Sequence, residues 1–149
     1  MNTIFPTNKA DIYKNLDFFI ENFLQNYASK RNFDLGPPHP NVSKLSPYIK
    51  RRFLSEKEIL ETIFPKYSLN LVDKFVQEIF WRTYWRGWLE FHPKVYSEFK
   101  KNIKQYEIPK KTGIECFDHW TEELLDTGYL HNHARMWYAS IWIFTLKRS

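Results

Sequence analysis

The most informative part of this sequence is GYLHNHARMWYASIWIF, residues 128–144. Gly128 ends one helical pattern, and the residues that follow predict a second helix that is apolar over almost its whole circumference. Four side chains recur at helical spacing and share one face of that helix, namely His131, Arg135, Tyr138 and Trp142. An arginine among so much aromatic surface is costly unless it meets a carboxylate, a phosphate or a flat π system. We therefore expect this helix to form the wall of a binding site.

The rest of the chain also shows apolar residues at helical spacing, and nowhere the sustained alternation of a β-strand. Asn8 and Ser46 are expected N-caps, and Ser55 followed by Glu58 has the form of a capping box. Gly and Pro residues mark the breaks between helices. The sequence therefore predicts an all-α, multi-helical bundle, with a short helix that has Pro47 in its first turn and longer helices over residues 9–27, 55–64, 69–91, 94–106, 113–125 and 129–146.

Composition limits the kind of site that this chain can form. The 149 residues predict one domain, over residues 1–149. Aromatic residues make up 19% of the chain while only 4 glycines are present, and neither GxGxxG nor GxxxxGK[ST] occurs, so a Rossmann or P-loop phosphate site is not expected. Lys and Arg number 22 against 17 Asp and Glu. The resulting net charge of +5 favours a polyanionic partner such as nucleic acid over a merely solvated basic surface.

Cys116 is the only cysteine, so an intrachain disulfide is excluded and a reducing compartment fits. No window of about 18 apolar residues is present, and the first residues lack the basic-then-apolar form of a signal peptide. We expect a soluble, cytoplasmic protein without a membrane segment. His131 and His133 stand two residues apart and point to different faces of a helix, which argues against a metal site.

The predicted helix over residues 69–91 carries five notable side chains on one broad face. At 100° per residue they lie within about 60° of Glu78, and they are Phe75, Glu78, Trp81, Arg82 and Trp85. A carboxylate, a guanidinium and two indoles suit a flat, polar ligand, because nucleic-acid bases stack on indoles and a carboxylate accepts hydrogen bonds from the N–H groups of the bases. The alternative is an exposed amphipathic helix with a Glu78–Arg82 pair, and spacing alone leaves both interpretations open.

Residues 42–46 place two small hydroxyls and Lys44 before a predicted helix start. Backbone N–H groups converge at such a position and the helix dipole is positive there, so phosphate binds well. The other interpretation of these residues is an ordinary N-cap and turn.

Three motifs, in their order along the chain, resemble the C-terminal, flavin-binding domain of the DNA photolyase and cryptochrome family. Two of them are VSKLSPYI, residues 42–49, and QEIFWR, residues 77–82. The third motif begins with a Thr-Gly turn and an Asp, which here are Thr112, Gly113 and Asp118. It continues with a Gly, an aromatic residue and His-Asn-x-x-Arg-Met, which here are Gly128, Tyr129, His131, Asn132, Arg135 and Met136. The resemblance extends from about residue 27 to residue 144.

The resemblance implies an enzyme of the deoxyribodipyrimidine photo-lyase type, which repairs pyrimidine dimers in DNA with light and reduced FAD as electron donor. The residues implied in catalysis are Glu78, Trp81 and Asn132. Those implied in FAD binding are Tyr27, Val42, Ser43, Lys44, Leu45, Ser46, Phe75, Arg82 and Arg135. Those implied in contact with damaged DNA are Arg31, Glu78, Trp81, Trp85 and His133.

This chain departs from the family pattern in several ways. Lys44, Phe75 and His133 stand where the family more often has Arg, Trp and Arg. In the family an α/β antenna domain precedes the flavin domain, and a later segment holds the Asp that pairs with the counterpart of Arg135. Neither is found in these 149 residues. We therefore expect a partial flavin-binding domain, incomplete at its C-terminus, with weak or no retention of FAD by itself. Either these residues are a fragment of a longer protein, or a second polypeptide completes them, or the fold has been repurposed.

Two other functions stay open at this point. A cryptochrome-like signalling module would bind FAD and respond to light without repairing DNA. A flavin-free, basic helical module would be colourless and would bind nucleic acid with an affinity that falls steeply as salt is added.

Overall fold

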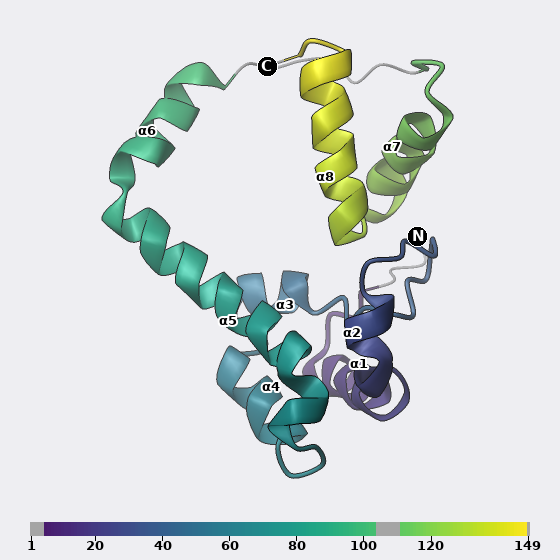
Figure 1. Cartoon of the computed structure of the whole chain (residues 1–149), viewed down its shortest axis with the longest axis vertical. Coiled ribbons are helices and arrows are strands. Elements are labelled where there is room, and N and C mark those ends of the chain that lie inside the picture. The colour runs from purple at the N-terminus through teal and green to yellow at the C-terminus, as the bar shows by residue number, and fades with distance from the viewer. Residues whose placement is uncertain (1–4, 104–110, 149) are drawn as a thin grey trace. The chain divides into compact units, whose positions relative to one another are not determined.

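The computed structural model describes residues 5–103 and 111–148, and every regular element in them is a helix (Figure 1). The predicted all-α fold is confirmed, since these residues contain no strand. The chain divides into two compact units, Met1–Trp88 and Leu89–Ser149, and each is described by itself. Among the described residues, no helix combines the length and the apolar character needed to cross a lipid bilayer. The single domain expected over residues 1–149 stays a prediction.

Six helical elements begin in the first unit, and in chain order they are α1 (Lys9–Asn22), the 3₁₀ turn η1 (Leu24–Asn26), α2 (Tyr27–Lys30), α3 (Ser46–Lys50), α4 (Glu56–Ile63) and α5 (Leu69–Phe91). Their inward side chains and Leu54, from the connection between α3 and α4, form one apolar core, which includes Ile12, Leu16, Ile20, Ile59 and Ile63. The N-terminal half of α5 adds Val72, Phe75, Val76 and Ile79 to this core. Each such aliphatic side chain stabilises the fold by about 1.5–3 kcal/mol relative to its exposure to water.

Local capping explains where several of these helices begin. The side chain of Asn8 accepts a hydrogen bond from the Asp11 amide at 2.9 Å, which confirms the predicted N-cap of α1. Ser55 and Glu58 form both bonds of the predicted capping box at the start of α4. The prediction for α5 is confirmed at both ends, since the helix runs over residues 69–91.

Two predictions about this unit are wrong. Ser46 does not cap α3: the helix begins at Ser46 itself, and Leu45 in the N-cap position makes no side-chain capping bond. The hydroxyl that bonds the backbone here belongs to Ser43, which accepts from the Leu45 amide at 3.5 Å. The helix predicted over residues 9–27 is also interrupted, because the backbone leaves helical geometry at Phe23 (φ −128°, ψ −22°) and continues as η1 and α2.

The capping box is expected to make the stability of the first unit depend on pH. The Glu58 carboxylate accepts hydrogen bonds from the Tyr13 hydroxyl at 2.7 Å and from the amide and hydroxyl of Ser55, and these bonds lower the pKa of Glu58 from 4.5 to about 2. A lowered folded-state pKa means that the ionised form stabilises the fold fully above about pH 4.5 and loses that effect as the pH falls to about 2. Glu58→Gln is expected to weaken this part of the acid dependence. Urea unfolding at about pH 6 and about pH 2.5 measures how much stability each protein loses between the two pH values. An equal loss in the wild type and in Glu58→Gln would refute the role of the Glu58 carboxylate in this acid dependence.

The second unit contains α6 (Pro93–Asn102), α7 (Glu115–Thr127), α8 (Asn132–Ser140) and the π-helical turn η2 (Ile141–Thr145). Helix α6 begins at Pro93, a favourable first position, and ends at Asn102, because the backbone of Ile103 is extended (φ −65°, ψ 124°). The helix thus stops before its predicted end at residue 106, which itself lies outside the described residues. Helix α7 ends at Gly128, whose φ of 69° is left-handed and favours glycine. The helix end predicted at this glycine is thereby confirmed, although α7 runs over residues 115–127 and not over the predicted 113–125.

Helix α8 begins three residues later than predicted, because His131 acts as its N-cap. The Nδ1 atom of His131 accepts a hydrogen bond from the His133 amide at 3.2 Å. Further along, the ring of Tyr138 stacks on the buried ring of Phe117 from α7, with centroids 4.2 Å apart and planes 11° apart. Trp142 lies against the same ring at 6.3 Å. These two aromatic side chains of the predicted site wall therefore pack against α7.

Candidate functional site

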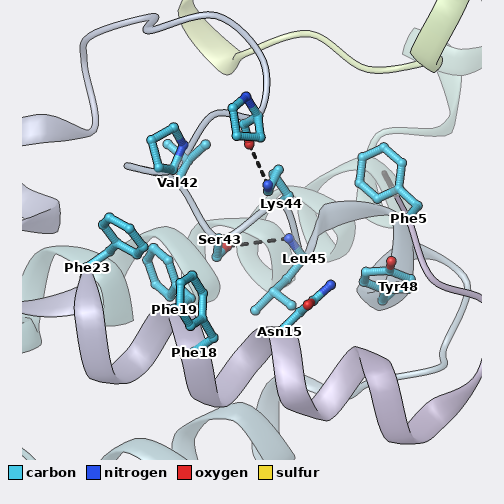
Figure 2. Close-up of a pocket in the computed structure, with 12 residues that line it drawn as sticks. Phe5, Asn15, Phe18, Phe19, Phe23, Val42, Ser43, Lys44, Leu45 and Tyr48 are labelled. Atoms are coloured by element: carbon cyan, nitrogen blue, oxygen red, sulfur yellow. Dashed lines mark hydrogen bonds between the residues drawn. The ribbon is translucent and has the colours of Figure 1, made fainter. Parts of the chain in front are cut away.

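A cavity of about 230 Å³ lies beside residues 42–45 in the first unit (Figure 2). The rings of Phe18, Phe19 and Phe23 line it from α1 and its end, and Phe5, Asn15, Pro38, Pro40 and Tyr48 complete its wall. Figure 2 shows Lys44 on the loop that faces the rings of α1. The cavity thus combines an aromatic wall with one cationic side chain.

Lys44 lacks an anionic partner in the part of the chain that the structure describes. Its backbone is left-handed (φ 53°), and its Nζ atom donates a hydrogen bond to the carbonyl oxygen of Pro38. The side chain is half-buried, and burial lowers the pKa of the Lys44 ammonium below its usual value. An ammonium has three N–H donors, so two remain for another acceptor. An anion in the cavity would therefore relieve the cost of removing this charge from water.

The other residues of the predicted phosphate loop differ in how deeply they are buried. Val42, Ser43 and Ser46 are half-buried, and Val42 and Ser43 line the cavity. The side chain of Leu45 is 2% exposed and belongs to the core. The hydroxyl of Ser43 and the ammonium of Lys44 are therefore the polar side-chain groups that this loop presents to the cavity.

A second polar group of residues lies where α2 meets α5. The Arg31 guanidinium forms a hydrogen-bonded ion pair with the Glu78 carboxylate, and Lys74 lies 3.9 Å from the same carboxylate. Their side chains are 19% exposed for Arg31 and 33% exposed for Glu78. Burial raises the pKa of the neighbouring Tyr27 hydroxyl, and Arg31 and Glu78 also act on that pKa. The structure thus brings together three predicted site residues from two helices.

Phe75 lies behind this polar group. Its ring meets the Tyr27 ring edge-on at 5.0 Å and the Phe19 ring at 5.4 Å, and only 4% of Phe75 is exposed. Phe75 therefore supports Tyr27 from within the core. Its predicted contact with a cofactor stays a prediction.

The side chains of the broad face predicted on α5 do not all have the same surroundings, since Phe75 lies in the core and the others named below lie outside it. Trp81 is 47% exposed and lines an open apolar groove of about 700 Å³ with Phe64, Phe80 and Tyr84. Trp85 is 51% exposed, and its ring stacks on that of Trp81 at 6.2 Å with the planes 24° apart. Arg82 is half-buried. Helix α5 therefore offers two stacked indoles and a guanidinium outside the core.

In the second unit, the predicted site residues lie at the start of α8. Asn132 is exposed and His133 is half-buried, with its ring 5.6 Å from that of His131. Arg135 is exposed: its Nε atom donates to the Leu130 carbonyl at 2.9 Å, and its guanidinium lies 5.1 Å from the centre of the Tyr129 ring. Because water reaches this guanidinium, the large cost of burying an unpaired charge does not arise.

The Thr-Gly-Asp motif has a local structural role. The Asp118 carboxylate accepts from the Thr112 hydroxyl at 2.7 Å and from the amides of Thr112 and Gly113, which closes the turn before α7. These bonds, with the Thr112 hydroxyl first, lower the pKa of Asp118. No group of three or more His, Cys, Asp or Glu side chains is arranged to hold a metal ion within residues 5–103 and 111–148.

Sequence reasoning missed two features of the site. Glu78 was considered as a partner of Arg82, four residues away, but it pairs with Arg31, which is 47 residues away. The resemblance implied that Arg31 and Glu78 both contact DNA, but it implied no pairing between them. Tyr48, whose side chain lines the cavity, was not considered as a site residue, because nothing in its local sequence distinguishes it from a core aromatic residue.

Comparison with known proteins supports the resemblance over most of the chain. No family model matches it, and no solved structure matches it. The deoxyribodipyrimidine photo-lyase of Alkalihalophilus pseudofirmus is 29% identical over 85% of this chain and 29% of its own length. The enzymes of that name from Neurospora crassa and Escherichia coli are each 24% identical, over 93% and 91% of this chain but 25% and 32% of their own lengths. The resemblance to the DNA photolyase family is thus confirmed: the chain is similar to the deoxyribodipyrimidine photo-lyases over most of its residues and spans about a quarter to a third of their length.

Proposed function

We propose that this chain forms part of a photolyase-type flavin domain, which repairs pyrimidine dimers in DNA with light and reduced FAD. The observation that carries the proposal is the cavity beside Lys44. It stands at the loop that the family resemblance assigns to the phosphates of FAD, and it joins a half-buried ammonium to an aromatic wall. Relatives that share 24–29% identity over 82–93% of this chain are named for that repair activity.

The residues beside the cavity fit one end of such a cofactor. Lys44 retains two N–H donors for a phosphate, and the Ser43 hydroxyl adds a third polar contact. Tyr27, which Phe75 supports, and Arg82 are proposed to hold other parts of the cofactor. Arg135, in the second unit, stays a predicted cofactor residue. Bound FAD would supply the electron for repair, while the protein supplies binding, orientation and electrostatics.

The exposed face of α5 fits a base that has left the DNA helix. A base stacked on an indole gains about 1–3 kcal/mol, which offsets much of the cost of unstacking it from DNA. Trp81 and Trp85 present such rings, and the Glu78 carboxylate lies three residues before Trp81 on the same helix. We propose that Glu78 accepts hydrogen bonds from the damaged bases and that Asn132, His133 and Arg31 lie near the DNA.

The same face of α5 also favours a second candidate function, namely flavin-free binding of nucleic acid. Stacked indoles next to arginine bind unpaired bases without any cofactor. A third candidate, a cryptochrome-like module, shares the FAD site and differs only in lacking repair.

One experiment separates these functions. The protein is titrated with FAD in the dark, so that weak binding is detected without desalting, and the complex is then reduced and illuminated with a dimer-containing oligonucleotide. The proposed function predicts bound, coloured flavin and light-dependent loss of the dimer. Bound flavin without repair would support the signalling function, and a colourless protein whose DNA affinity falls steeply with salt would support the flavin-free one.

A further inference from the structure

One of the two oxygen atoms of the Glu78 carboxylate is held by cations, and the other is open to solvent. The Arg31 guanidinium donates a hydrogen bond to Oε1, and the Lys74 ammonium lies 3.9 Å from the same atom. Oε2 has no partner among the described residues, yet it is not enclosed by protein, and 33% of the Glu78 side chain is exposed. An ionised carboxylate accepts hydrogen bonds at both oxygens. Glu78 therefore has one oxygen that is fixed and one that an outside donor can reach.

Arg31 is itself well anchored at the end of α2. Its amide donates to the Tyr27 carbonyl at 2.9 Å. The side chain of the buried residue Asn41 donates to the carbonyls of Lys30 at 2.8 Å and Phe33 at 2.7 Å, on either side of Arg31 in the sequence. The guanidinium thus reaches Glu78 from a backbone that Asn41 holds in place.

A glutamate that meets bases in DNA needs support from its surroundings for two reasons. Its side chain has several rotamers, so an unsupported carboxylate is seldom in the position to accept a hydrogen bond from a base. Its charge also repels the phosphates of DNA. The bond from Arg31 restricts the rotamers of Glu78, and the two cations offset its charge. The pair thus presents the carboxylate in one position and with little net charge.

We propose that Arg31 is a positioning residue, which holds Oε1 of Glu78 so that Oε2 accepts hydrogen bonds from the damaged bases, and that Arg31 thereby sets the preference for damaged over undamaged DNA. The proposal rests on the proposed function in that it takes Glu78 as the group that meets the damaged bases. Bases that remain stacked in undamaged DNA do not reach such a group. An arginine that contacted only phosphates would instead contribute equally to the binding of damaged and undamaged DNA.

The ratio of two affinities tests this role. Oligonucleotides of the same sequence, with and without a pyrimidine dimer, are titrated with the protein in the dark with FAD present. We expect Arg31→Gln to lower the preference for the dimer-containing oligonucleotide about tenfold, as for the loss of a hydrogen bond to a charged group. In the Glu78→Gln background the same change should have no further effect, because Arg31 acts through Glu78.

Arg52→Gln is the matched control, since Arg52 is an exposed arginine of the same unit that pairs with Glu56 at 3.7 Å. It should leave the preference unchanged. Arg31→Lys keeps a cation beside Glu78 but lacks the planar guanidinium, so it should lose part of the preference, and it serves as the test if Arg31→Gln does not fold. Helical circular dichroism checks the fold of each variant.

The possible results are distinguishable. An unchanged preference in the folded Arg31 variants would overturn the inference, as would an equal loss from Arg31→Gln in the wild-type and Glu78→Gln backgrounds. A wild-type protein that binds both oligonucleotides equally would overturn it as well. If the preference depends on Arg31 and Glu78 but FAD is not bound and no dimer is repaired, the inference stands and the proposed function fails. If FAD-dependent repair occurs and the Arg31 variants keep the preference, the proposed function stands and the inference fails.

Discussion

Replacement of Phe75 with alanine is expected to lower the free energy of unfolding by about 3–5 kcal/mol. The Phe75 ring is 4% exposed and fills the space between the rings of Phe19 and Tyr27, at 5.4 Å and 5.0 Å. Removing it loses the transfer energy of the ring and leaves a cavity that α1 and α5 cannot close without moving. Urea unfolding followed by helical circular dichroism measures the loss.

Phe80→Ala is the matched control for this prediction. It deletes the same side chain from the same helix, but Phe80 is 55% exposed, so the loss should stay below about 1 kcal/mol. Equal losses in the two variants would contradict the placement of Phe75 in the core.

Replacement of Glu78 with glutamine is expected to reduce light-driven repair at least about 100-fold, while bound FAD stays the same. Glutamine keeps the shape of the side chain but removes the charge that we propose to meet the damaged bases. The same change leaves the largely buried Arg31 guanidinium without its anionic partner. Because both side chains keep some contact with water, the accompanying loss of stability should reach only about 1–3 kcal/mol.

Glu61→Gln provides the control for Glu78→Gln. Glu61 is an exposed carboxylate on α4, paired with Lys57 at 3.6 Å across one helical turn, so its loss should change neither repair nor stability measurably. Repair rates are compared at equal bound flavin under the same light. Repair by Glu78→Gln at the wild-type rate would exclude Glu78 from the reaction.

Much of the fold was predictable because it depends on residues that are close in sequence. The bonds between Asn8 and Asp11, and between Ser55 and Glu58, join residues three apart, and both were predicted from spacing alone. The left-handed turn at Gly128 is likewise a property of one residue. These local signals predict where helices begin and end, independently of how the rest of the chain packs.

What sequence reasoning missed depends on residues that are far apart. The pairing of Arg31 with Glu78 and the burial of Phe75 behind Tyr27 follow from how α1, α2 and α5 pack, and no local pattern contains that information. The phosphate loop was predicted from residues 42–46, but the wall opposite it comes from α1 and from Tyr48. The error at Ser46 is local by contrast, because Ser43, only three residues earlier, supplies the hydroxyl that bonds the backbone.

The central claim is that Lys44 binds a phosphate of FAD, and a titration of FAD against two lysine variants tests it most directly. Lys44→Gln removes the charge but keeps a donor for the Pro38 carbonyl, and Lys50→Gln makes the same change at an exposed lysine of α3. FAD fluorescence reports binding in each case. We predict that Lys44→Gln weakens FAD binding about 10–100-fold and that Lys50→Gln leaves it unchanged. Equal FAD affinity in Lys44→Gln and the wild type would contradict the claim.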